Sequence, residues 1–106
     1  MDTNEDSVIV VDNDAASRYE ATVAGHLAVI DYERLPDRIT LIHAGVPPEV
    51  EGRGIAGKLS RFALDDARAK HLSVIPRCPY VAAYIKRHPE YLDLVPQGYR
   101  SHVENT

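Results

Sequence analysis

A glycine-rich segment, residues 46–58, separates two hydrophobic patterns of different period. Before it, apolar residues occur in short β-branched or alternating runs, which are typical of strands. After it, apolar residues recur with helical spacing at Ile55, Leu59, Phe62, Ala63 and Ala67. The segment therefore joins a strand to an amphipathic helix, and its glycines lie at the start of that helix.

Four strands are expected before the glycine-rich segment and one after the helix. The runs that predict them are residues 8–11, 18–23, 27–34, 38–46 and 72–75. Short turns join the first four into an antiparallel meander. The helix runs to about His71, so the last strand should lie parallel to the fourth as a βαβ unit. A short second helix starts at Cys78-Pro79 and ends at His88-Pro89. These elements predict an α/β (α+β) fold.

Length and charge limit the class of protein. A chain of 106 residues, 44% hydrophobic and 26% charged, has room for one domain with a modest core. We expect that domain over residues 7–95, with a disordered segment at 1–6 and a flexible tail at 96–106. The net charge of −4, without a Lys/Arg-rich run, argues against a protein that mainly binds nucleic-acid backbones.

The apolar runs and the single cysteine give expectations about location. No apolar run approaches the roughly 20 residues that span a membrane, so no membrane partner is expected. Cys78 is the only cysteine, which rules out an internal disulfide and favours a reducing, cytoplasmic location. The histidines are scattered and show no metal-ligand spacing, so no metal site is predicted.

The glycine-rich segment is open to several physical interpretations. A helix start carries unpaired N–H groups and a partial positive charge, and glycines let phosphate oxygens approach it. Gly52-x-Gly54-x-x-Gly57 matches a dinucleotide fingerprint, and Gly52-x-x-x-x-Gly57-Lys58 matches most of a P-loop. Both folds need several βα units, whereas this chain predicts one, and Leu59 replaces the Ser or Thr of a P-loop. A plain connector is the third interpretation, although its glycines cost backbone entropy.

Two stretches of the sequence resemble the short GNAT-like acetyltransferase family. They are Val46-Pro-Pro-Glu-Val-Glu-Gly-Arg-Gly-Ile-Ala-Gly-Lys-Leu59 and Ile75-Pro-Arg-Cys-Pro-Tyr-Val-Ala-Ala-Tyr-Ile-Lys-Arg-His-Pro-Glu-Tyr91. The first is shared with GNAT proteins generally, the second is highly specific, and the resemblance covers residues 8–95. It implies a mixed sheet, splayed near its middle, that binds acetyl-CoA in the splay.

The resemblance also implies which residues hold acetyl-CoA. The pyrophosphate is expected on the loop amides, and the pantetheine arm beside the end of the fourth strand. Tyr80 is expected to contact pantetheine or to be structural, and Arg87 to reach the adenine or 3′-phosphate end or to be a solvated helix terminus. The cofactor-binding set is Ala44, Gly45, Val46, Glu51, Gly52, Arg53, Gly54, Ile55, Ala56, Gly57, Lys58, Tyr80 and Arg87.

Two positions depart from the family pattern. Glu51 stands where the loop usually opens with Gln or Arg, and its carboxylate repels a pyrophosphate unless Arg53 or Lys58 compensates. Relatives often read His-Thr-Glu-Val on the fourth strand, where this chain reads His43-Ala-Gly-Val46. A carboxylate that could serve as general base is absent, which weakens the case for catalysis more than the case for binding.

Three residues are candidates for the chemistry of acetyl transfer. Cys78 precedes Pro79 at the expected helix start, which favours a thiolate nucleophile or base; the alternative is a buried small hydrophobic residue. Tyr84 matches the tyrosine that GNAT enzymes often use to protonate the departing thiolate; the alternative is an aromatic packed against the sheet. His43, expected to face with Leu41, is a proton acceptor or a histidine hydrogen-bonded within the sheet.

These observations favour an acetyl-CoA-dependent N-acetyltransferase that passes acetyl to an amine, directly or by way of Cys78. The alternatives are a module that binds CoA without turnover and a protein-interaction domain of GNAT shape. The amine acceptor is a small molecule or a peptide that the sequence does not identify. A monomer or a weak dimer is expected.

Overall fold

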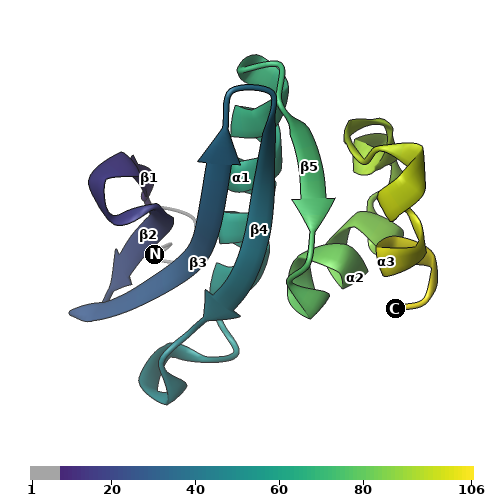
Figure 1. The fold of residues 1–106 in the computed structure, drawn as a ribbon. Helices are drawn as coiled ribbons and strands as arrows, with labels where there is room; N and C mark the ends of the chain where they lie inside the picture. Colours follow the sequence, from purple (N-terminus) through teal and green to yellow (C-terminus); the bar gives the residue numbers. More distant parts are fainter. Residues whose placement is uncertain (1–7) are drawn as a thin grey trace.

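The computed structural model describes residues 8–106, which form a five-stranded mixed sheet with helices (Figure 1). The strands are β1 (Val10–Asn13), β2 (Arg18–Val23), β3 (His26–Leu35), β4 (Arg38–Gly45) and β5 (Ser73–Pro76). The α-helices are α1 (Ile55–Ala69), α2 (Pro79–Arg87) and α3 (Ser101–Glu104). Short 3-10 helices are η1 (Asp14–Ala16), η2 (Pro48–Val50), η3 (Pro89–Leu94) and η4 (Gln97–Tyr99). The disorder expected at residues 1–6 concerns positions outside the described residues.

The predicted meander and βαβ unit are confirmed. The strand order is β1-β2-β3-β4-β5, antiparallel from β1 to β4 and parallel between β4 and β5. α1 is the crossover that joins the two parallel strands. β1 lies two residues later than the run at residues 8–11, because Asp12 and Asn13 pair with the backbone of β2. Backbone pairing with a neighbour, rather than side-chain type, sets the end of this strand.

The core lies between α1 and one face of the sheet. In Figure 1, α1 lies behind the middle strands. Its residues Leu59 and Leu64 are fully buried in one cluster with Tyr19 and Ile30 of the sheet. On the opposite face of β3, Leu27 is 41% exposed. Strand residues alternate between the two faces, so the face that α1 does not cover remains accessible over β3.

A β-bulge in β4 reverses the expected orientation of His43. In the β3–β4 register, Asp31 pairs with His43 and Tyr32 pairs with Leu41, so Ile42 is an extra residue. Beyond it the alternation of faces shifts by one position. Ala44 therefore packs on the core side with Leu41, whereas His43 lies on the open face with Asp31. The expectation that His43 faces with Leu41 is wrong.

A polar network ties β1 to β3 and α1. Arg34 donates a hydrogen bond of 2.7 Å to Asp12, and the Tyr32 hydroxyl donates one of 2.6 Å to the same carboxylate. Lys70 at the end of α1 donates another of 3.1 Å. Burial alone would raise the pKa of Asp12, but the bonds from Tyr32, Arg34 and Lys70 outweigh it and lower that pKa below 3.8. The network stabilises the folded state while Asp12 is ionised.

The C-terminal segment is folded, whereas the sequence predicts a flexible tail over residues 96–106. α3 lies beside α2, and Val103 is buried with 4% exposure (Figure 1). The Arg100 side chain donates a 3.0 Å hydrogen bond to the carbonyl of Val95, and Lys86 donates one of 2.8 Å to that of Thr106. One buried valine in a polar stretch gives no periodic signal, so the segment's order depends on these tertiary contacts.

Candidate functional site

The sheet opens where β4 continues past the end of β5. The parallel pairing stops at Leu41 and Pro76, and the N–H of Cys78 donates a 2.8 Å hydrogen bond to the carbonyl of Leu41. Pro76 has no N–H with which to extend the ladder, and Pro79 at the first position of α2 turns the chain into that helix. The β5-facing edge of residues 42–45 in β4 is therefore left open.

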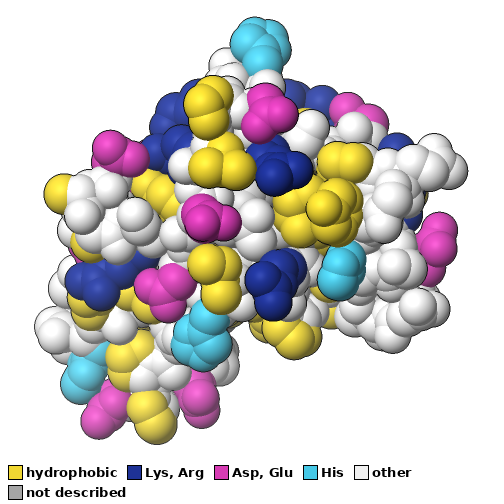
Figure 2. Space-filling view, viewed as in Figure 1, with side chains coloured by type: hydrophobic (Ala, Val, Ile, Leu, Met, Phe, Trp, Pro, Cys, Tyr) yellow, Lys and Arg dark blue, Asp and Glu magenta, His cyan; other side chains and the backbone are white. Residues whose placement is uncertain are grey.

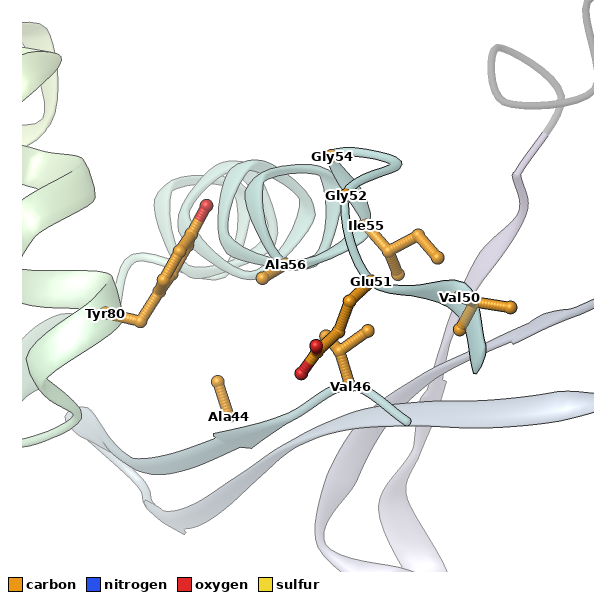
Figure 3. Close-up of a pocket in the computed structure, with 9 residues that line it drawn as sticks. All are labelled: Ala44, Val46, Val50, Glu51, Gly52, Gly54, Ile55, Ala56 and Tyr80. Carbon is orange, nitrogen blue, oxygen red and sulfur yellow. The ribbon is translucent and has the colours of Figure 1, made fainter. Parts of the chain in front are cut away.

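An open pocket of about 420 Å³ occupies this opening on the α1 side (Figure 3). It is enclosed by the end of β4, the glycine-rich segment, the start of α1 and Tyr80 of α2. Its lining residues are Ala44, Val46, Val50, Glu51, Gly52, Gly54, Ile55, Ala56 and Tyr80. All but Val50 are among the residues expected to bind the cofactor. Val50 is 1% exposed, and its only sequence signal is an apolar side chain inside a polar, proline-rich loop.

The loop before α1 leaves its backbone N–H groups unpaired. Gly52 and Gly54 have φ angles of 83° and 73°, in the left-handed region that favours glycine. Gly54 is the N-cap of α1 and provides no side-chain cap. The first helical bond runs from Lys58 N–H to the Gly54 carbonyl, and the N–H groups of residues 52–57 donate to no other group within residues 8–106. This row of N–H donors at a helix start can bind an anion by donating hydrogen bonds to it.

Glu51 brings a negative charge into the pocket. Figure 3 shows its carboxylate directed into the space between the start of α1 and the end of β4. The departure noted in the sequence therefore lies at the mouth of the site rather than on an outer surface. A carboxylate in this position repels an anion bound to the neighbouring amides.

Two tyrosines of α2 border the start of α1. A side-chain carbon added at Gly57 would lie 3.6 Å from the Tyr80 hydroxyl oxygen and 3.8 Å from the Tyr84 ring. Tyr84 is 8% exposed, stacks on His88 at a centroid distance of 4.2 Å, and its hydroxyl has no hydrogen-bond partner within residues 8–106. Burial raises the pKa of Tyr84 above its ordinary value of 10.0. The hydroxyl is therefore protonated near neutral pH and free to donate.

Cys78 and His43 lie in different surroundings. Cys78 is the N-cap of α2, but it is 2% exposed and belongs to the apolar core. His43 has a side chain 68% exposed, with Nδ1 3.6 Å from a carboxylate oxygen of Asp31. Gly45 makes room for this imidazole, because a side-chain carbon at Gly45 would lie 3.4 Å from His43 Cε1. Sequence reading did not identify Asp31, since the pairing depends on the bulged register.

The remaining expected cofactor residues lie outside the pocket lining. Gly45 turns toward the open face and Gly57 lies against the tyrosines. Arg53 lies within the loop between Gly52 and Gly54, and Lys58 lines a separate hollow beside β1. Arg87 is exposed at the end of α2. Within residues 8–106, no group of three or more His, Cys, Asp or Glu side chains is arranged to hold a metal ion. In the same part of the chain, no helix has the length and apolar character needed to cross a membrane.

A family model described as GCN5-related N-acetyl-transferase matches residues 18–94. The chain belongs to the GCN5-related N-acetyltransferase (GNAT) family. Curated relatives similar to this GNAT chain include protein NATD1 of Gallus gallus and of Homo sapiens, each 39% identical over 69 residues. The similarity covers 62% of this chain and 63% and 61% of those proteins, so it spans less than two-thirds of their length.

Proposed function

We propose that this GNAT protein transfers acetyl from acetyl-CoA to an amine. The observation that carries the proposal is the row of unpaired N–H groups at residues 52–57, which borders the pocket at a helix start. Membership of the GNAT family supports the reaction class. The residues of the loop suit the pyrophosphate of acetyl-CoA. Glu51 suits it less well, because its carboxylate repels a bound diphosphate.

Different parts of the pocket bind different parts of acetyl-CoA. The amides of the loop hold the pyrophosphate. The open edge at Ala44 of β4 and at Val46, just beyond the strand, holds the pantetheine arm by backbone hydrogen bonds. Tyr80, from α2, forms the wall of the pocket on that side. Bound acetyl-CoA supplies an activated acetyl thioester. The chain itself orients this group and excludes water from the buried end near Tyr84.

The reaction requires two proton movements. The amine nitrogen forms a bond to the thioester carbon, the carbon–sulfur bond breaks, and its electron pair leaves on sulfur. Tyr84 donates a proton to that sulfur, because its hydroxyl is unpartnered and stays protonated near neutral pH. His43 on the open face accepts the proton that the amine loses, and Asp31 orients the imidazole.

We favour direct transfer over a covalent route through Cys78. The thiol is packed in the apolar core with 2% exposure, so an acceptor cannot approach it without opening the domain. Cys78→Ala should therefore retain turnover. An acetylated Cys78 detected by mass spectrometry, together with loss of turnover in Cys78→Ala, would contradict the direct route.

The test is thiol release from acetyl-CoA with a panel of amines. Tyr84→Phe should lower kcat about 10²-fold or more while the Kd for CoA is unchanged, because the variant loses one proton donor. Tyr80→Phe removes the same atom one helical turn earlier, and we expect its effect on the Kd for CoA rather than on kcat. Equal kcat for Tyr84→Phe and the parent protein would remove Tyr84 from the mechanism.

Binding of CoA without turnover is the second candidate function. Gly45 favours this function because it supplies no base on β4, and so does the 68% solvent exposure of the His43 side chain. Thermal stabilisation by CoA with no thiol release for any amine would support this function. Absence of stabilisation at millimolar CoA would contradict both functions.

A further inference from the structure

A second groove lies on the sheet face that α1 does not cover. It has a volume of about 310 Å³ and is bordered by β3, β4, the end of β5 and the folded C-terminal segment. Figure 2 views the molecule from this side and shows Lys or Arg side chains beside hydrophobic ones over β4 and β5. We call it the sheet-face groove; the pocket described above lies on the other side of β4.

Arg38 and Arg77 give this groove its charge. Neither guanidinium makes a hydrogen bond or an ion pair with another group of residues 8–106. Several other arginines are paired: Arg68, for example, bonds both carboxylate oxygens of Asp93 at 2.9 Å. Arg53 and Arg87 also have no partner within residues 8–106, but neither lines this groove. Glu33 contributes one opposing carboxylate. In a chain of net charge −4, the groove is thus a local site with more positive than negative side-chain charge.

The rest of the groove is suited to a carbon skeleton. Ile75 lies in the sheet between the two arginines, and Thr40 is its partner on β4. Tyr99 and His102 form the outer wall, with ring centroids 6.0 Å apart and planes inclined by 15°. This wall exists because the C-terminal segment is folded.

The groove ends where the sheet opens. Thr40 and Ile75 are one register step before Leu41 and Pro76, the last paired residues of β4 and β5. Arg77 follows at once, so its side chain lies beside the opening through which the two faces communicate. Arg38 is paired with Ser73 at the other end, roughly 13 Å away at about 3.3 Å per strand residue.

We propose that the sheet-face groove binds the acceptor, an amine whose molecule also carries an oxyanion, either a carboxylate or a phosphate. Arg77, with Arg38 for longer molecules, binds the oxyanion by charge-assisted hydrogen bonds, and the amine points to the opening. This inference rests on the proposed acetyl transfer, in which the acetyl group arrives at the same opening from the α1 side. The acceptor's carbon chain lies over Ile75 against the aromatic wall.

Matched pairs of amines test the assignment. Phosphoethanolamine is compared with ethanolamine, and glycyl-aspartate with glycyl-asparagine amide, so that the two arms distinguish phosphate from carboxylate. In at least one arm, the anionic member should have a kcat/KM about 10- to 100-fold higher. Arg77→Gln should abolish that preference by lowering kcat/KM for the anionic member to about that of the neutral member. Arg61→Gln, the same charge change on the exposed outer side of α1, should keep the preference.

Binding is followed separately from turnover by NMR, with the same amines titrated into the CoA-saturated protein. Shifts at Thr40, Ile75 and Tyr99 that are lost in Arg77→Gln would support the groove. Shifts elsewhere, or a preference that survives Arg77→Gln, would overturn it while leaving acetyl transfer intact. Specific shifts in the groove without thiol release for any amine would overturn both acetyl transfer and the acceptor assignment.

Discussion

Replacing Glu51 with glutamine should tighten the binding of CoA. The Glu51 carboxylate is directed into the pocket, next to the amides that we assign to the pyrophosphate (Figure 3). Two unit charges about 6 Å apart in water repel by about 0.7 kcal/mol, and the two charges of a pyrophosphate double this to about 1.4 kcal/mol. Screening at physiological salt, with a Debye length of about 8 Å, leaves about half. Glu51→Gln should therefore lower the Kd for CoA by about threefold.

The assay is isothermal titration of CoA into both proteins at low, physiological and 1 M salt. The difference between the parent and Glu51→Gln should be largest at low salt and vanish at 1 M. Glu49→Gln is the matched control: its carboxylate lies two residues earlier, 3.8 Å from His26, and does not line the pocket. A Kd that is unchanged or higher in Glu51→Gln at low salt would refute the placement of the pyrophosphate. An equal decrease in the Kd for CoA in both variants would show that the effect comes from the net charge of the protein and not from the position of Glu51.

Two further predictions concern stability. Gly54→Ala should lower the free energy of unfolding by about 1–2 kcal/mol because φ is 73° there. Gly57→Ala should raise the free energy of unfolding by about 0.5–1 kcal/mol because the helix has room for a methyl group. Equal effects of the two substitutions in chemical denaturation would contradict the loop conformation. Asp12→Asn should cost about 1–3 kcal/mol at pH 7. Since the pKa of Asp12 is lowered in the folded state, the stabilisation by Asp12 is complete above its ordinary pKa of 3.8 and disappears as the pH falls through the folded-state pKa. A stability difference between the parent protein and Asp12→Asn that persists unchanged at lower pH would exclude the ionised network.

The order of elements and the position of the pocket could be predicted from the sequence. The change of hydrophobic period at residues 46–58 depends only on local spacing, and it placed the glycines between β4 and α1. Proline at the first position of α2 and of η3 has a local steric effect, so the limits of α2 were also predictable. Of the residues that line the pocket, only Val50 is absent from the set expected from the sequence, because its burial depends on packing beneath the loop.

Other features depend on contacts between residues distant in the chain. The bulge at Ile42 arises from the pairing of β4 with β3, and it moves His43 to the open face beside Asp31. Local alternation assumes an unbroken register, so it assigns His43 to the wrong side. The folded C-terminal segment likewise follows from burial of Val103 beside α2, for which the polar sequence gives little indication.

Local spacing and backbone sterics therefore determined the elements, their order and the glycine-rich loop at the start of α1. Tertiary structure decided the direction of Glu51, the face of His43 and the existence of the sheet-face groove. The physical reason is that hydrophobic period and glycine or proline geometry act over a few neighbouring residues. Side-chain direction at a site depends instead on strand register and packing between elements, which the complete fold establishes.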